Sequence, residues 1–343
     1  MSNTNRRCFI DSTPSIFLVC SPLQAMCAIN AIKEFKIHIY KFILVLVKDK
    51  RNQQLFTLLA QYHIQYEIIY SFQLGKFEKY NIFKANNEGY KRAFIGDMRS
   101  LMMHTIAFKK LQNNSDIVYL DDGNDTISLL KGMKYSPNGV YEKIRYKFIK
   151  KYFAIIGKSR KITFGKFLYT IYDIPNDNYV IRLNNLDTFI KEKDSCAQNG
   201  IYIIGTNFSM YCQEGFVSKD VCKQQMEKLF CCLTSENKDT NIYYIPHGRD
   251  IETFPIELCR KYSVIYHPVD ISVELYMKDL EQVPLEIYGY TSSALVNLKM
   301  MFPTTRIVDM VFDVVTKSRK GDEIKLISDY YKTIGIQQLR YHS

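Results

Sequence analysis

Short apolar runs of strand length alternate with segments of helical periodicity along most of the chain. In the first half, the predicted strands are 15–20, 41–47, 66–70 and 116–120, and the predicted helices are 22–35, 51–63 and 98–111. Continuously apolar strands joined by helices are typical of a parallel sheet that helices cover on both faces. The first half is therefore predicted to form an α/β domain.

The second half repeats this alternation. Its predicted strands are 201–205, 241–246, 262–266, 285–290 and 305–311, and its predicted helices are 218–234, 271–280 and 292–300. Because domains usually span about 100–200 residues, a chain of 343 residues suits two domains. We predict two Rossmann-like domains facing a central cleft, 1–185 and 198–315, then a C-terminal helical segment, 316–343. The polar stretch 158–198 is predicted to contain the boundary.

The composition limits the partners and the location of the protein. A net charge of +11 indicates anionic partners, such as nucleic acid, a membrane surface or an acidic small substrate. No apolar run reaches the ~18 residues of a membrane-spanning helix, and Asp11 and Pro14 interrupt the N-terminal run. Nine cysteines without a CxxC pair suggest reduced thiols rather than a disulfide framework or a zinc site. We therefore predict a cytoplasmic protein.

Much of the positive charge lies in residues 142–166, where Glu142 is the single acidic residue. Apolar residues recur there at roughly helical spacing: Ile144, Phe148, Ile149, Phe153 and Ile156. The pattern fits a helix that lies on an anionic membrane, and equally a core-facing helix with a solvated basic side. The sequence contains no zinc pattern, RNA-binding signature or recognition helix, so no nucleic-acid partner is predicted and a nucleic-acid-binding protein is a remote alternative.

An Asp-Asp-Gly sequence directly follows the predicted strand 116–120. Composition alone makes Asp121-Asp122-Gly123 a turn, since Asp tolerates turn geometry and Gly allows a positive φ. Its position adds a functional interpretation, because ligands of open α/β sheets bind beyond the carboxyl ends of the strands. A carboxylate there can take a proton from a sugar hydroxyl. Asp121 and Asp122 are therefore candidate catalytic residues.

A histidine ends the predicted strand 241–246. His247 lies between Pro246 and Gly248, which restrict its backbone, and Arg249 follows. An imidazole and a guanidinium both donate hydrogen bonds to phosphate oxygens, so this segment is a candidate phosphate site. His267 ends another predicted strand and is a near-duplicate of lower rank.

Two serines lie between the predicted strand 285–290 and the helix that follows it. One hydroxyl of Ser292 and Ser293 is expected to cap the helix, and the other hydroxyl and the free N–H groups suit an anion. The segment 20–24, at the end of the first strand, is expected to line the same cleft. Neither GxxxxGK[ST] nor GxGxxG occurs, which argues against ATPase and dinucleotide-binding functions.

The ordered set of Asp-Asp-Gly, His and Ser-Ser motifs resembles bacterial sialyltransferases, especially the lipooligosaccharide sialyltransferase family. Members carry a D/E-D/E-G, a His-Pro and a Ser/Thr motif in that order. The surrounding stretches are also similar, from near residue 16 to about 310: CSPLQ, YLDDGNDTISLL, YYIPHGRD and LEIYGYTSSALVNLKMMFP. The resemblance implies a GT-B fold, CMP-sialic acid as the donor, a galactose-terminated acceptor glycan, inversion at the anomeric carbon, and no cofactor or metal.

The resemblance also implies roles for single residues. Asp121 would be the general base, with Asp122 orienting it or serving instead, and His247 would donate to the leaving phosphate. The family usually has His-Pro where this chain has His247-Gly248, so His267, which a proline follows, stays open for that role. The residues expected to contact the donor are Gly205, Pro246, Arg249, Tyr290, Ser292 and Ser293.

Several alternatives stay open at this level. The same fold can transfer a hexose from a UDP-sugar, and Asp121 and Asp122 would then hold a metal that bridges a diphosphate. The acceptor could belong to lipooligosaccharide, O-antigen or capsule, and the sequence does not choose its linkage. A homodimer and a peripheral position on the inner face of the cell membrane, through residues 142–166, are further expectations.

Overall fold

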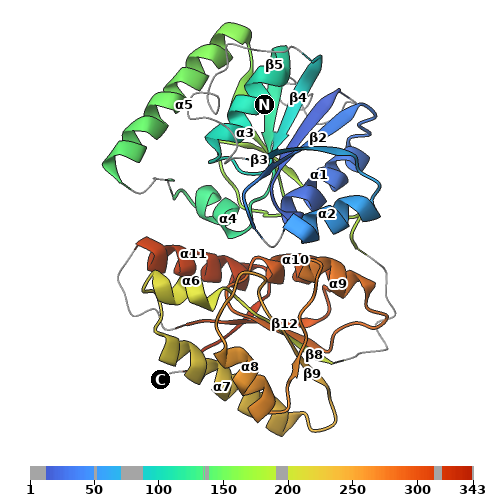
Figure 1. Cartoon of the computed structure of the whole chain (residues 1–343), viewed down its shortest axis with the longest axis vertical. Coiled ribbons are helices and arrows are strands. Elements are labelled where there is room, and N and C mark those ends of the chain that lie inside the picture. The colour runs from blue at the N-terminus through green and yellow to red at the C-terminus, as the bar shows by residue number, and fades with distance from the viewer. Residues whose placement is uncertain are drawn as a thin grey trace. The chain divides into compact units, whose positions relative to one another are not determined.

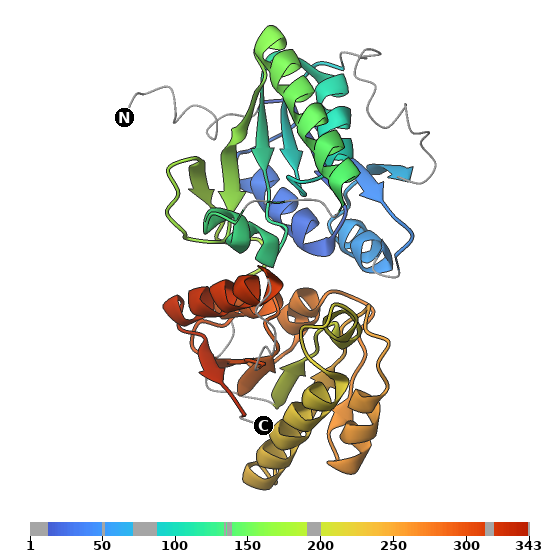
Figure 2. The ribbon, with the colours of Figure 1, turned by 90° about the vertical axis from the view of Figure 1, so that its left-hand side faces the viewer.

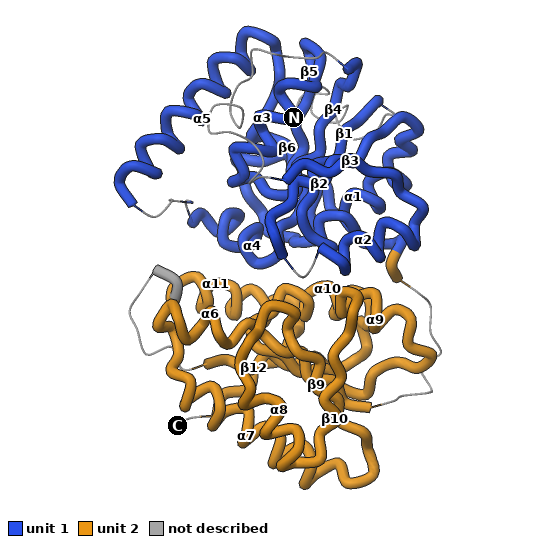
Figure 3. The backbone as a smooth tube through the Cα atoms, viewed as in Figure 1, with its two compact units in different colours: residues 1–188 blue, residues 189–343 orange. Residues whose placement is uncertain are grey.

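The chain divides into two compact units, Met1–Thr188 and Phe189–Ser343 (Figure 3). The structure is a computed structural model that describes residues 13–49, 52–70, 88–133, 135, 139–190, 200–312 and 319–341. Each unit contains one sheet whose strand pairs are all parallel. The predicted α/β class with two Rossmann-like domains is confirmed, and its strand orders follow below.

Unit 1 is built on a seven-stranded sheet in the order β3-β2-β1-β4-β5-β6-β7. Its strands are β1 (Ser15–Val19), β2 (Tyr40–Leu46), β3 (Tyr66–Tyr70), β4 (Tyr90–Ile95), β5 (Leu111–Tyr119), β6 (Thr163–Thr170) and β7 (Val180–Leu183). Its helices are α1 (Pro22–Glu34), α2 (Asn52–Gln61), α3 (Leu101–Lys110), α4 (Asn124–Leu130) and α5 (Val140–Arg160). In Figure 1, α3 and α5 lie on one side of this sheet and α1 and α2 on the other. The strand order reverses between β1 and β4, the point where open α/β sheets bind ligands.

The centre of this sheet is an aromatic core. Phe17 of β1 stacks on Phe42 of β2 and on Phe94 of β4, with ring centroids 5.0 and 4.6 Å apart. All three side chains have no exposed surface. Aromatic pairs at such distances add to the stabilisation from area burial. These contacts hold β1 and β4 together at the switch point.

Unit 2 has a six-stranded sheet in the order β10-β9-β8-β11-β12-β13. Its strands are β8 (Ile201–Ile204), β9 (Ile242–Ile245), β10 (Ile265–Tyr266), β11 (Glu286–Gly289), β12 (Arg306–Met310) and β13 (Gln337–Leu339). Its helices are α6 (Phe208–Gln213), α7 (Lys219–Glu236), α8 (Phe254–Lys261), α9 (Val273–Asp279), α10 (Ala294–Met301) and α11 (Arg319–Thr333). This is the Rossmann order, with its switch point between β8 and β11.

The structure differs from the predicted domain organisation at two places. The stretch 158–198 was interpreted as a polar boundary segment without predicted strands, but it contains β6 and β7 of the first sheet. Gly165, at a φ of 73°, and the adjacent Lys166 interrupt the apolar run of β6, which hid it from pattern analysis. At the C-terminus, α11 is followed by β13, which pairs with β12. The segment 316–343 is therefore more than a helical extension.

Helix α5 has two different faces. Ile149, Phe153 and Gly157 are buried against unit 1, as the core-facing interpretation of the basic stretch predicted. Ile144 and Phe148, which the sequence grouped with them, point away from that core and are 64% and 74% exposed. Across the part of the chain that the structure describes, no helix is both long and apolar enough to cross a membrane.

Candidate active site

Asp121 is an interior residue. Its side chain has no exposed surface, and its carboxylate accepts hydrogen bonds from the Thr170 hydroxyl (2.5 Å) and the Ile171 backbone N–H (2.7 Å). The Cys27 thiol also donates to it (3.8 Å). Burial raises the pKa of Asp121 to about 7, although these donors favour the ionised form. Asp121 thus joins the end of β5 to β6 and α1.

Asp122 faces outward from the same turn. Its side chain is 21% exposed, and its Oδ1 accepts a hydrogen bond from Gln24 Nε2 (2.7 Å). Its other oxygen pairs with Arg99, and its backbone N–H donates to Thr126 (2.9 Å). Burial raises the pKa of Asp122, the neighbouring carboxylates act in the same direction, and Arg99 opposes them. A carboxylate whose pKa lies near neutrality and that keeps some exposure suits a general base.

Arg99 gathers the carboxylates at this edge of the sheet. It follows β4, and its guanidinium contacts Asp97 (3.0 Å), Asp125 (2.6 Å) and Asp122. One guanidinium faces three carboxylates, so the cluster keeps a negative charge when all three are ionised. That excess charge makes proton uptake by Asp122 easier.

Gln24 fixes Asp122 from the first turn of α1. It is fully buried on α1, and its Oε1 accepts a hydrogen bond from the Cys20 N–H (2.8 Å). A Cβ atom on Gly96, directly after β4, would lie 2.2 Å from this oxygen, so a larger residue there would displace the Gln24 side chain. Residues 20–24 were predicted to line the cleft, and Gln24 does reach the Asp-Asp-Gly turn. Gly96 and Arg99 were missed, because β4 begins with charged residues and was not predicted.

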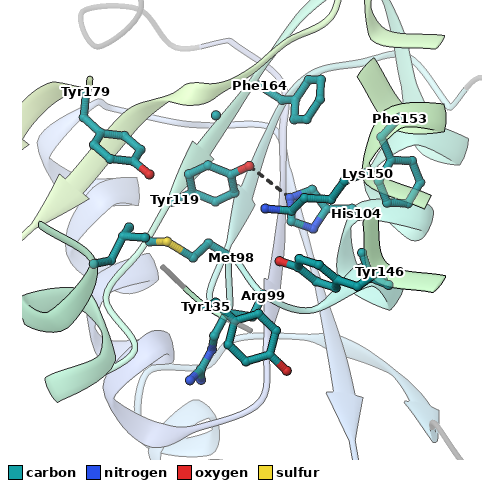
Figure 4. A pocket seen from close by; sticks show the side chains of 13 residues that line it. Met98, Arg99, His104, Tyr119, Tyr135, Tyr146, Lys150, Phe153, Phe164 and Tyr179 are labelled. Atoms are coloured by element: carbon teal, nitrogen blue, oxygen red, sulfur yellow. Dashed lines mark hydrogen bonds between the residues drawn. The ribbon is translucent and has the colours of Figure 1, made fainter. Parts of the chain in front are cut away.

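An aromatic cavity of about 340 Å³ lies beside this cluster (Figure 4). Arg99 lines it and joins it to Asp122. Its aromatic lining comes from β5, α5, β6, β7 and the segments near them: Tyr119, Tyr135, Tyr146, Phe153, Phe164 and Tyr179. Cavities of this volume with aromatic walls and few polar groups are typical small-molecule sites.

Besides Arg99, two basic side chains line the cavity. His104 Nε2 contacts the Tyr119 hydroxyl (3.0 Å), and its Nδ1 contacts the Ser100 carbonyl (2.8 Å). Burial lowers the pKa of His104 to about 4, so its imidazole is neutral and serves the core. The Lys150 ammonium lies 5.0 Å from the centroid of the Tyr146 ring, and burial lowers the pKa of this lysine. Lys150 as a whole residue is exposed, and Figure 4 shows its nitrogen directed into the cavity.

Unit 2 brings three of the predicted donor residues to adjacent strand ends. Gly205 follows β8, His247 follows β9, and Tyr290 follows β11, and these strands are neighbours in the order β9-β8-β11. A Cβ on Gly205 would lie 2.6 Å from the Tyr244 hydroxyl and 3.0 Å from the His247 nitrogen. The close approach of these two strand ends therefore requires glycine.

The two predicted histidines differ in position. His247 is half-buried, and its Nδ1 accepts a hydrogen bond from the Arg249 N–H (3.2 Å). A neutral ring in this arrangement carries its proton on Nε2 and presents a donor. His267 follows β10, at the edge of the sheet, and packs on Tyr276 with ring centroids 5.0 Å apart. His247 is one strand nearer to the Ser-Ser turn after β11.

The turn that contains Ser292 and Ser293 is held by the buried carboxylate of Asp309. Thr291, at a φ of 45°, donates its N–H to Asp309 Oδ1 (2.7 Å), and Ser328 donates to the other oxygen (3.2 Å). Ser292 Oγ accepts from the Ala294 N–H (3.4 Å), as the capping prediction requires of one hydroxyl. Ser293, the N-cap residue of α10, makes no side-chain capping bond.

The side chains of the predicted donor residues Arg249, Pro246 and Tyr290 differ in exposure. Arg249 is exposed and Pro246 is half-buried, so both adjoin the surface beside His247. Tyr290, in contrast, has no exposed surface and stacks on Phe312 in the core, with ring centroids 5.1 Å apart. Its side chain serves packing rather than donor contact, because burial removes it from the strand-end surface. Sequence reasoning missed Asp250, which accepts bonds from the Ser209 N–H and hydroxyl and anchors the His247 loop.

Comparisons with known proteins give structural matches alone: neither a family model nor a curated protein matches the sequence. A 2,6-sialyltransferase of Photobacterium sp. JT-ISH-224, solved with CMP and lactose, matches with a TM-score of 0.54 at 13% identity, over 95% of this chain and 78% of that one. An α/β-galactoside α-2,3-sialyltransferase of Photobacterium phosphoreum matches with a TM-score of 0.50 at 12% identity, over 95% and 98%.

A protein of Listeria monocytogenes assigned as a UDP-N-acetylglucosamine 2-epimerase matches with a TM-score of 0.52 at 10% identity, over 93% of this chain and 87% of that one. At these identities the likeness concerns the fold and not the substrate. The chain therefore has the fold of two Rossmann-like domains that GT-B glycosyltransferases share with sugar-nucleotide epimerases.

Proposed function

We propose that the protein is an inverting sialyltransferase that moves sialic acid from CMP-sialic acid to a galactose-terminated surface glycan. The observation that carries this proposal is the partly exposed Asp122 with a raised pKa, at the carboxyl ends of the strands beside the unit 1 switch point. The shared fold with two sialyltransferases and the ordered motifs support it.

In this proposal unit 1 handles the acceptor. Asp122 takes the proton of the acceptor hydroxyl, and Gln24 and Arg99 hold the carboxylate in one orientation. Asp121 is buried and supports the turn, so it serves as a positioning residue. The cavity beside Arg99 offers aromatic surface for the sugar next to the reacting one.

Unit 2 handles the donor. The Nε2 proton of His247 and the Ser293 hydroxyl are donors for the single phosphate of CMP, and the first N–H groups of α10 add to them. The acceptor oxygen forms its bond to the anomeric carbon of sialic acid while the bond from that carbon to the phosphate oxygen breaks. The electron pair leaves with CMP, and these donors stabilise the negative charge on its phosphate.

A donor screen tests the proposal. Purified protein is incubated with CMP-sialic acid or with UDP-hexoses, together with galactose-terminated and other acceptors, and the products are identified by mass spectrometry. We expect a sialylated product from CMP-sialic acid and a thermal shift with CMP. Transfer from UDP-sugars alone would refute the donor assignment.

The alternative is a UDP-sugar-dependent hexosyltransferase of the same fold. The likeness to a UDP-N-acetylglucosamine 2-epimerase favours it, since that fold also accepts a diphosphate nucleotide. The two candidates differ in nucleotide preference, so stabilisation by UDP and not by CMP, with activity lost in EDTA, would favour the alternative.

A further inference from the structure

Helix α5 carries an exposed apolar stripe. Tyr141, Ile144, Phe148 and Ile155 are 74%, 64%, 74% and 60% exposed. At about 100° of rotation per residue, these positions fall within about one sixth of the helix circumference. Isolated exposed apolar residues are common, but four large side chains in one line form a contiguous patch, which marks an interaction surface.

The stripe does not contribute to the fold of unit 1. The opposite side of α5 packs inward through Ile149, Phe153 and Gly157, and Tyr146 of the same side lines the aromatic cavity. Figure 2 shows α5 lying along the sheet of unit 1, with its length against the strands. The helix is therefore fixed by one face while the apolar stripe stays on the other.

Positive charge flanks the stripe on both sides. Helical rotation places Lys147, Lys151 and Lys158 along one border and Arg145 along the other. No acidic residue within the described ranges forms an ion pair with any of these three lysines, whereas Arg145 pairs with Glu142 (2.7 Å). An apolar line bordered by lysines is the pattern of a helix that lies in the plane of a membrane interface.

We propose that the outer face of α5 docks the protein on an anionic lipid surface, with the stripe in the headgroup region and the lysines on the lipid charges. A second copy of the chain fits this face less well, because a symmetric contact would bring the lysine borders together. Nucleic acid would match the lysines but would leave the apolar stripe in water. Lipid satisfies both features.

Vesicle binding tests the proposal without any sugar nucleotide, so its failure is separate from failure of the proposed function. The chain contains no tryptophan, so Phe148→Trp gives a single fluorescent reporter. Ile251→Trp, at a position 73% exposed in unit 2, is the matched control. With vesicles of phosphatidylcholine and phosphatidylglycerol, we expect a blue shift for Phe148→Trp and none for Ile251→Trp. The shift should decrease with added salt.

Charge and apolarity are then tested separately by co-sedimentation with the same vesicles. Phe148→Asp should weaken binding more than tenfold and Lys147→Glu about fivefold or more, with Ile251→Asp as the control for a new surface charge. All three positions are exposed, so the variants should fold, which circular dichroism checks. Equal binding of Phe148→Asp and wild-type protein would overturn the proposal. A dimer that Phe148→Asp dissociates, without any vesicle binding by the wild type, would also overturn it.

Discussion

Replacing Asp122 by asparagine separates charge from shape at the proposed base. The amide keeps an oxygen that accepts the hydrogen bond from Gln24, and the backbone N–H still donates to Thr126, but the amide cannot take a proton and loses the pairing with Arg99. A positioned general base contributes about 10²–10⁴-fold to the rate, so we expect kcat/KM to fall by that factor. The assay measures sialic acid transfer from CMP-sialic acid.

The dependence of kcat/KM on pH is the second measurement that tests this variant. Asp122 must be ionised to accept a proton, and its pKa is raised to about 7, so kcat/KM of the wild type should fall about tenfold for each pH unit below that value. Above it, the rate should level off. The Asp122→Asn protein should lose this acid limb along with most of its activity.

Asp121→Asn is the matched control, because it changes the neighbouring carboxylate that we assign to positioning. Its amide cannot accept from both Thr170 and Ile171, which should lower the free energy of unfolding by about 1–3 kcal/mol. The folded fraction should keep activity within about tenfold of wild type. If Asp121→Asn loses more activity than Asp122→Asn and removes the acid limb, the assignment of the base to Asp122 is refuted.

The remaining predictions concern stability and the two strand-end sites. The folded-state pKa of Asp121 is raised to about 7, so ionisation of this carboxyl opposes folding. The free energy of unfolding of the wild-type protein, measured with urea, should therefore fall as pH rises from about 4 to 7. The same measurement on Asp121→Asn should show a smaller fall. His247→Ala should reduce kcat about 10²-fold or more and His267→Ala less than about threefold, which steady-state kinetics with CMP-sialic acid compares. Gly205→Ala should weaken CMP binding in calorimetry, since its Cβ would displace the His247 loop. Gly96→Ala should lower kcat by displacing the side chain that orients the base, while CMP affinity stays unchanged.

The strand-end turns were predictable because they depend on local sequence. Apolar runs such as 116–120 end at polar and glycine residues, and parallel strands place their carboxyl ends at one edge. The fold class and the Asp-Asp-Gly turn follow from that pattern. The strands β4 and β6 did not follow, because Lys91, Arg92, Gly165 and Lys166 break the apolar periodicity, and pairing with neighbouring strands outweighs local preference there. The four-residue strand β7 was not predicted either.

The roles within the site depended on tertiary contacts. Sequence treats Asp121 and Asp122 almost alike, because they are adjacent and identical in chemistry. The structure separates them, since one side chain points inward to Thr170 and the other outward to Arg99, which follows a strand that the sequence did not reveal. Burial and long-range partners set the pKa and the access of each carboxylate. The sequence alone determined where polar chemistry gathers, and only the folded chain decided which side chain faces the solvent.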